Sequence, residues 1–276
     1  MRNPPRKIAF VLAATEHGTM IVNRFDHCMY DPTHGIGVGL QILEDGGFEL
    51  AEVDMALRLL SLRRQHFGDG VVALDCGANI GVHTVEWAKH ASGWGQVIAI
   101  EAQERLFYAL AGNIAINNCL NARAMHAAVA AQVGTMRIPM PDYLSPGSFG
   151  SLELRPSERN EFIGQAIDYS DAATVDIRTI TIDSLDFTRL DLLKIDIEGM
   201  EIEALAGAAA SLARCRPVVI VEALKSDARC LRDILERQGY RLFAAGINLL
   251  AIHGEDKTLK DFERTDAPPV QVIKLA

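Results

Sequence analysis

The sequence predicts an α/β protein with a doubly wound, mostly parallel sheet, and three observations support this fold class. From residue 71 onward, short apolar runs typical of buried strands alternate with segments of helical apolar spacing. The run 71–74 ends in an acid and enters a glycine-rich turn, and the run 97–100 also ends in an acid. A glycine-rich strand end, followed by an acidic strand end 20 residues after Gly81, is typical of the adenosine-binding half of this fold. Right-handed crossovers then place helices on both faces of the sheet.

The elements of this pattern follow one another in a regular order. The expected strands are 71–74, 97–100, 122–129, 133–138, 175–182, 190–197, 217–221, 240–244 and 248–253, and the expected helices are 79–90, 104–117, 199–212 and 227–238. The alanines of 122–129 also suit a helix, and the last two strands form a hairpin around Gly246.

The chain divides into an accessory segment, a central domain and a tail. Residues 1–69 contain a possible strand and an amphipathic helix at 49–67, which can cover the sheet or pair with another subunit of a homo-oligomer. Residues 70–255 form the α/β domain, and 256–276 form a polar tail. The stretch 139–172 is rich in proline and glycine, which predicts an inserted loop of the kind that forms lids or substrate-binding segments.

The composition excludes several classes of protein. Of the 276 residues, 49% are hydrophobic, so a large core is expected. The formal charge of −9, without a concentrated basic patch, disfavours nucleic acid as a partner. Five scattered cysteines without a Cys-x-x-Cys pair favour a reducing cytoplasm over a disulfide framework or zinc site. The apolar run 8–14 makes a poor secretory signal, and no run reaches the ~18 residues of a membrane span.

The glycine-rich turn indicates which nucleotide is bound. Asp75 precedes Gly77, and an acid is poorly suited to a pyrophosphate but suits a cationic ligand. S-adenosylmethionine carries an ammonium group, a sulfonium and no phosphate, so it matches the loop better than a nicotinamide dinucleotide does. Glu101 is expected to accept hydrogen bonds from the ribose hydroxyls. The alternatives are a turn that only packs a helix on the sheet, and a solvated acid at a strand end.

A second group of charged residues follows the strand that ends near residue 197. Lys194, Asp196 and Glu198 alternate onto one side of this strand, which is costly inside a sheet unless the strand end faces a cleft. Helix capping together with a lysine–carboxylate pair is the alternative. Asp196 and Glu222 both end strands and suit a divalent cation, but no third ligand is evident, so no metal site is predicted.

These residues resemble a known family. The loop 75–81, Glu101, Asn117-Asn118 and above all the run Lys194-Ile195-Asp196-Ile197-Glu198-Gly199-Met200-Glu201 are similar to the FkbM family of S-adenosylmethionine-dependent methyltransferases. The resemblance covers roughly residues 71–253. It implies a class I methyltransferase fold, Rossmann-like, with seven strands and an antiparallel last strand. It also implies a methyl-transfer activity, mostly O-methylation of sugars and natural-product hydroxyls.

The resemblance also implies roles for single residues. The methionine part of the cofactor would lie along the glycine loop, the ribose at Glu101 and the adenine near Ala128. The cofactor-binding residues of the loop are Asp75, Gly77, Ala78, Asn79 and Gly81.

A hydroxyl acceptor needs a base, and Asp196 and Glu198 are the catalytic candidates for this role or for positioning. Lys194 would hold a substrate oxygen or tune their charge. The expected acceptor is a small molecule, a sugar or a glycan, over which the aromatic residues of 139–172 could close.

Two other functions fit parts of the sequence. A nicotinamide-dependent oxidoreductase would share the fold, but Asp75 and the lack of a Tyr-x-x-x-Lys pattern argue against it. A non-catalytic binding module on a methyltransferase fold should have lost its cofactor residues, which are all present here. The sequence therefore favours a cytoplasmic S-adenosylmethionine-dependent O-methyltransferase.

Overall fold

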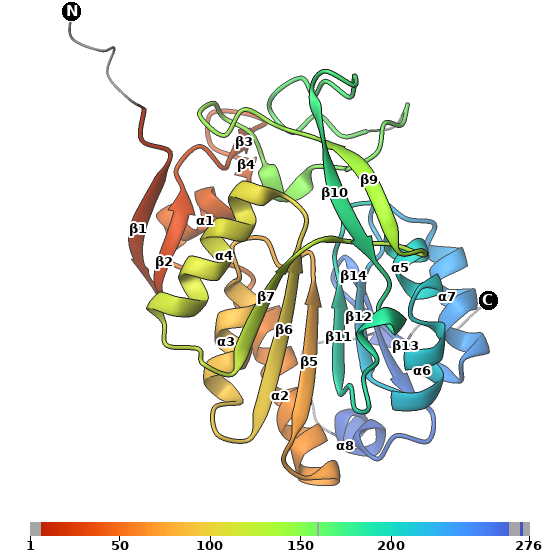
Figure 1. Ribbon diagram of the computed structural model, residues 1–276. Coiled ribbons are helices and arrows are strands. Elements are labelled where there is room, and N and C mark those ends of the chain that lie inside the picture. Colours follow the sequence, from red (N-terminus) through yellow and green to blue (C-terminus); the bar gives the residue numbers. More distant parts are fainter. Residues whose placement is uncertain (1–6, 159, 265–270, 273–276) are drawn as a thin grey trace, which may run out of the picture. The chain divides into compact units, whose positions relative to one another are not determined.

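The computed structural model describes residues 7–158, 160–264 and 271–272, which belong to two compact units (Figure 1). The first unit combines the chain up to Glu49 with Arg137–Asp176. The second combines Leu50–Met136 with the chain from Ile177 onward. The helix predicted at 49–67 is therefore part of the α/β unit, whereas most of the expected accessory segment joins the inserted loop.

The second unit is built around an eight-stranded sheet (Figure 1). Its strands run in the order β7 (Ala122–His126), β6 (Gly95–Glu101), β5 (Val71–Cys76), β11 (Leu192–Ile195), β12 (Val218–Glu222), β14 (Asn248–His253), β13 (Tyr240–Ala245) and β15 (Gln271–Val272). The strands from β7 to β12 are parallel, and β14 is antiparallel to both of its neighbours. This confirms the predicted seven-stranded, mostly parallel sheet with an antiparallel last strand, to which β15 adds a short edge strand.

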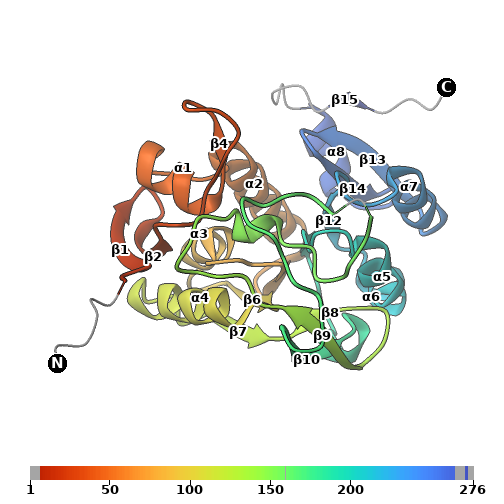
Figure 2. The same ribbon diagram turned by 90° about the horizontal axis from the view of Figure 1, so that it is seen from above.

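Helices cover both faces of this sheet. They are α2 (Leu50–Phe67), α3 (Val82–His90), α4 (Glu104–Ile116), α5 (Glu201–Ala206), α6 (Ala209–Cys215), α7 (Ala228–Arg237) and α8 (Thr258–Arg264). Figure 2 shows α2, α3 and α8 on one side of the sheet and α5 and α6 on the other. Leu74, Cys76 and Ile195 pack with Leu205 of α5 and Leu231 of α7. Because side chains alternate along a strand, Asp75 and Lys194 point to the opposite side, toward α2 and α3.

The helix predicted at 199–212 is two helices in the structure. Gly207 and Ala208 separate α5 from α6. A Cβ atom on Gly207 would lie 2.4 Å from the carbonyl oxygen of Ala130, so the chain must approach closely here. The predicted strand 122–129 is also divided, because Ala128–Val129 forms β8 in a small sheet with β10 (Thr174–Ile180) and β9 (Gly134–Pro139).

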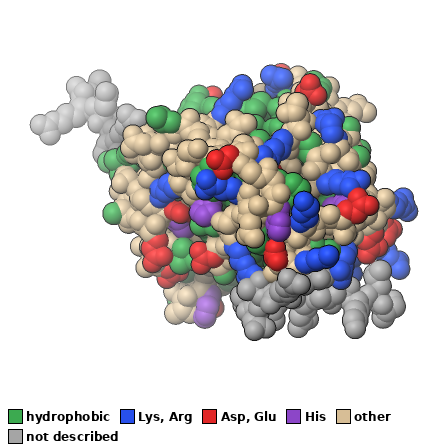
Figure 3. Space-filling view, turned by 90° about the horizontal axis from the view of Figure 1, so that it is seen from below, with side chains coloured by type: hydrophobic (Ala, Val, Ile, Leu, Met, Phe, Trp, Pro, Cys, Tyr) green, Lys and Arg blue, Asp and Glu red, His purple; other side chains and the backbone are tan. Residues whose placement is uncertain are grey.

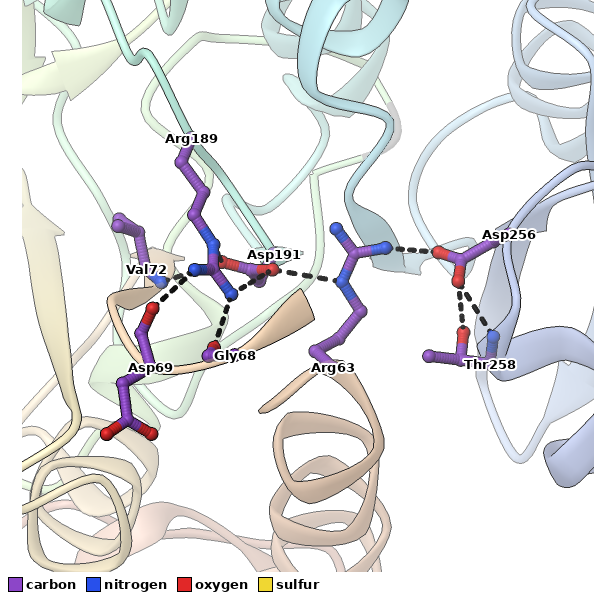
Figure 4. Close-up of polar contacts among 8 residues, drawn as sticks. All are labelled: Arg63, Gly68, Asp69, Val72, Arg189, Asp191, Asp256 and Thr258. Atoms are coloured by element: carbon purple, nitrogen blue, oxygen red, sulfur yellow. Dashed lines mark hydrogen bonds and ion pairs between the residues drawn. The ribbon is translucent and has the colours of Figure 1, made fainter. Parts of the chain in front are cut away.

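A buried network of charges joins α2 to the sheet and to the segment before α8 (Figure 4). Asp191, which is fully buried, accepts hydrogen bonds from Arg63 at 3.1 Å, from Arg189 at 2.7 Å and from the Val72 amide at 2.9 Å. Arg63 also pairs with Asp256, which in turn accepts from Thr258. The expected polar tail therefore contains an ordered helix, whose Leu259 and Phe262 are buried.

The first unit is smaller and irregular. It contains the hairpin of β1 (Phe10–Thr15) and β2 (Gly18–Asn23), the short strands β3 (Cys28–Met29) and β4 (Gly35–Ile36), and the helix α1 (Val38–Asp45). The buried Asp26 accepts from the amides of Gly39 at 3.1 Å and Phe149 at 2.9 Å. The inserted loop is thus held to the N-terminal segment by buried hydrogen bonds. Whether it acts as a lid stays a prediction.

The surface at the amino ends of the parallel strands carries both signs of charge. Figure 3 shows lysine, arginine, aspartate and glutamate side chains interspersed on this face. Among the residues that the structure describes, no helix combines the length and the apolar character needed to span a membrane.

Candidate functional site

The glycine-rich loop between β5 and α3 has an unusual backbone. Gly77, Asn79 and Gly81 have φ angles of 82°, 51° and 90°, in the left-handed region that favours glycine. Asn79 is one of the few non-glycine residues with this conformation, which costs energy and is concentrated at functional sites. The amides of Gly77 and Ala78 both donate to the carbonyl oxygen of Ile100 at 3.0 Å, so the loop is fastened to the end of β6.

Glu101, at the end of β6, is bound to the same loop. Its carboxylate accepts from the amides of Asn79 at 2.9 Å and Gln103 at 2.7 Å, one on each oxygen. Burial raises the pKa of Glu101 to about 7, although these two amides act in the opposite direction. The amide of Ala102 also bonds to Glu101, and the four lone-pair sites of a carboxylate leave room for a ribose hydroxyl beside these three amides. The predicted contact with the ribose is compatible with this geometry.

Asp75 lies inside β5 and is 1% exposed. Thr84 of α3 donates its hydroxyl proton to Asp75 at 2.6 Å, so the carboxylate already has a partner within the protein. Cys76, the next residue, is fully buried and belongs to the core. Ala128, predicted near the adenine, lies in β8 and is 2% exposed.

The charged segment after β11 forms a tight turn rather than a regular continuation of the strand. Glu198 and Gly199 have φ angles of 56° and 92°. Glu201 is fully buried and accepts from the amides of Ile197 and Gly199 at 3.1 Å and from the hydroxyl of Ser226. The last acid of the motif therefore fixes the turn, and the turn aims Asp196 and Glu198.

Two lysines neutralise part of this turn. Lys194 donates to Asp196 at 2.7 Å, as the predicted strand alternation requires, and Lys225 lies 2.6 Å from Glu198. The side chain of Lys194 is 4% exposed, whereas that of Asp196 is 31% exposed. Asp196 is therefore the member of the pair that a substrate can reach.

Glu52 of α2 is a site residue that the motifs do not reveal. Its carboxylate lies 3.3 Å from His83 and 3.9 Å from Lys194, and Asn248 donates to it at 2.5 Å. Burial alone would raise the pKa of Glu52, but His83, Lys194 and Asn248 together lower it to about 2. His83 of α3 is buried in this contact. Glu52 and Lys225 have no sequence signal beyond their charge.

Glu222, at the end of β12, completes a cluster of carboxylates. Oxygen atoms of Asp196, Glu198 and Glu222 all lie within 4.8 Å of one another. Burial, followed by the charges of Glu198, Asp196 and Glu201, raises the pKa of Glu222 to about 9. Among the described residues, no hydrogen-bond partner reaches Oε2 of Glu222.

Comparison with known proteins identifies the family. The model of the "Methyltransferase FkbM domain" matches residues 75–242, which is more than half of the chain. The chain belongs to the FkbM methyltransferase family. The match includes the glycine loop, Glu101, the segment from Lys194 to Glu201 and Glu222, and it confirms the predicted family and its cofactor, S-adenosylmethionine. No significant relative was found among curated proteins.

Two methyltransferases are among the solved structures that this chain resembles. The methyltransferase FkbM from Methylobacillus flagellatus KT is 18% identical, with a TM-score of 0.47 over 67% of this chain and 43% of its own. The magnesium protoporphyrin IX methyltransferase from Synechocystis PCC 6803, solved with bound SAM, is 13% identical, with a TM-score of 0.42 over 78% and 88%. This chain spans less than half of the first structure. Both TM-scores are below 0.5, so the assignment of the chain to its family rests on the match of the family model to residues 75–242.

The site of this FkbM methyltransferase suits a cationic cofactor. Glu101 and the carboxylates after β11 and β12 lie at the carboxyl ends of parallel strands of one sheet, where ligands of this fold bind. A sulfonium and an ammonium group are attracted by such an edge, whereas a pyrophosphate is repelled. The residues that would hold S-adenosylmethionine are those of the loop 77–81 and Glu101.

Proposed function

We propose that this FkbM methyltransferase transfers a methyl group to a hydroxyl of a small molecule, a sugar or a glycan. The observation that carries the proposal is the position of Asp196. A Cβ atom on Gly77 would lie 1.7 Å from the carbonyl oxygen of Asp196, so the cofactor loop and the charged turn are in direct backbone contact. A partly exposed carboxylate beside the cofactor loop is suitably placed to receive the proton of an acceptor hydroxyl.

The chemistry divides between the cofactor and the chain. S-adenosylmethionine held by the loop 77–81 and Glu101 would supply an electrophilic methyl group and would keep the electron pair of the broken C–S bond on its sulfur. Asp196 takes the proton of the hydroxyl on a carboxylate oxygen. Lys194 holds Asp196 by a hydrogen bond, and Glu52 holds Lys194, so the base is fixed by contacts that leave its other oxygen free.

The charge of the chain supports a small acceptor. A net charge of −9 opposes the approach of nucleic acid. We place the reaction in the cytoplasm because all five cysteines are free thiols in the fold.

Methyl transfer to a panel of acceptors tests this function. The protein is incubated with S-adenosylmethionine carrying an isotope-labelled methyl group, and the products from polyols, sugars and phenols are identified by mass spectrometry. Asp196→Asn should lower turnover by at least about 100-fold, the size of a general-base contribution, while cofactor affinity stays within about threefold. If the label reaches nitrogen or carbon acceptors instead, the hydroxyl assignment is wrong.

The alternative is a binding module on the same fold. It predicts that S-adenosylmethionine binds and that no acceptor is methylated under any condition of the panel. Glu198 and Lys194 would then serve only to fix the turn, and their replacement would change stability alone.

A further inference from the structure

The carboxyl groups after β11 and β12 outnumber the ammonium groups that pair with them. Among the residues that the structure describes, Lys194 pairs with Asp196 and Lys225 with Glu198, whereas Glu201 and Glu222 lie beside them. Lys194 contacts one oxygen of Asp196, and Lys225 contacts one oxygen of Glu198. Glu201 uses its oxygens on two backbone amides and a hydroxyl.

Glu222 is the observation that points to a ligand. Glu222 is 6% exposed, and its Oε2 atom has no hydrogen-bond partner among the residues that the structure describes. Leaving a buried carboxylate oxygen unpaired costs several kcal/mol, so such an atom normally serves a ligand or an ion. One carboxylate oxygen each from Glu222, Asp196 and Glu198 lie within 4.8 Å of one another.

We propose that Asp196, Glu198 and Glu222 form a site for a divalent cation of the Mg²⁺ or Mn²⁺ type. Ions of this type prefer oxygen ligands at about 2.1 Å, so two ligands lie at most ~4.2 Å apart. The oxygens of the three carboxylates lie within 4.8 Å of one another, so they would have to move closer together to bind one ion. Three protein oxygens leave about three positions of an octahedral ion for water or an acceptor.

The cation explains how a carboxylate can serve as the base. A carboxylate is a weak base toward a hydroxyl, and coordination to a metal ion lowers a hydroxyl pKa by many units. The ion would bind the acceptor oxygen, and the proton would pass to Oδ2 of Asp196, the oxygen that the ion does not bind, as the hydrogen bond from Lys194 to that oxygen gives way. Acceptors with two neighbouring oxygens, such as vicinal diols, would bind best because both oxygens can reach the ion. This role rests on the proposed function, whereas binding of the ion does not.

Titration with Mn²⁺ tests the site without cofactor or acceptor. Free Mn²⁺ is measured by electron paramagnetic resonance in the presence of the full-length protein, and the affinity is confirmed by calorimetry. We expect one Mn²⁺ per chain, displaced by Mg²⁺. Glu222→Gln keeps the size of the side chain and should weaken binding at least tenfold. Glu236→Gln, an exposed acid on α7, should bind as the wild type does.

Two results would overturn the site: no stoichiometric Mn²⁺, or unchanged affinity in Glu222→Gln. If that variant fails to fold, judged by thermal melting, Asp196→Asn replaces it, because Asp196 is partly exposed and its loss should equally weaken binding. Methyl transfer that persists after removal of bound metal would disprove the role of the ion but not the reaction. Mn²⁺ binding without any methyl transfer would support the site and disprove the proposed function.

Discussion

The backbone of Gly77 lies against the carbonyl group of Asp196, so closely that a Cβ atom on Gly77 would be 1.7 Å from that oxygen. The amide of Asp196 also donates to the carbonyl oxygen of Cys76 at 3.0 Å. These contacts join the ends of β5 and β11, and with them the cofactor loop and the charged turn. Position 77 therefore needs glycine for two reasons: its φ angle is positive, and there is no space for a Cβ atom.

Gly77→Ala should abolish cofactor binding. It should also lower the free energy of unfolding by more than the backbone strain of a left-handed φ angle alone would. The alanine side chain must displace the backbone of Asp196, which distorts both halves of the site. Gly93→Ala is a matched control, because Gly93 has the same φ of 82° with no atom within 4 Å of its added Cβ. The control should cost about 1–2 kcal/mol and leave cofactor affinity unchanged. Chemical unfolding measures the free energy of unfolding, and calorimetry measures the affinity for the cofactor. Equal effects of the two variants would refute the close contact between Gly77 and Asp196.

The pH dependence of cofactor binding should follow Glu101. Burial raises the pKa of this carboxyl to about 7, and only the ionised form is a strong acceptor for ribose hydroxyls. Protonation therefore weakens binding, and affinity should fall as pH decreases below about 7, by up to ~10-fold per pH unit. Calorimetry between pH 5.5 and 7.5 measures this. In Glu101→Gln, the affinity should be low and independent of pH over the same range.

Glu52→Gln should lower turnover about tenfold without weakening cofactor binding. The substitution removes the negative charge that holds Lys194 and His83, so the Lys194–Asp196 pair loses its fixed geometry. Asp54→Asn, an exposed acid on the same helix, is the control and should behave as the wild type. Separate measurement of kcat and KM distinguishes the outcomes. A loss confined to thermal stability would make Glu52 a structural residue only.

Asp191→Ala should destabilise the second unit by about 3–5 kcal/mol. It leaves Arg63 as a buried charge without its carboxylate at 3.1 Å and removes the acceptor of the Val72 amide. Asp69→Ala removes an exposed acid that pairs with Arg64, and it should cost less than about 1 kcal/mol. Urea unfolding of both variants measures the difference, and similar values would show that the buried network in Figure 4 contributes little.

The sequence predicted the sheet because its strands are apolar and its turns are marked by glycine. It also predicted the acids that end β6 and β12, since a charged residue after a buried run is a local signal. Glu52 and Lys225 were not predicted because their roles depend on tertiary contacts with the charged turn. The break at Gly207 was missed for the same reason, since its cause is the distant backbone of Ala130.

The most direct measurement of the central claim is calorimetric titration of S-adenosylmethionine into the wild type and Glu101→Ala. Glu104→Ala, a partly exposed acid three residues away, is the control. The account predicts micromolar binding by the wild type and the control, and at least ~100-fold weaker binding by Glu101→Ala. A folded wild type that does not bind S-adenosylmethionine, or a Glu101→Ala variant that binds it equally well, would contradict the account.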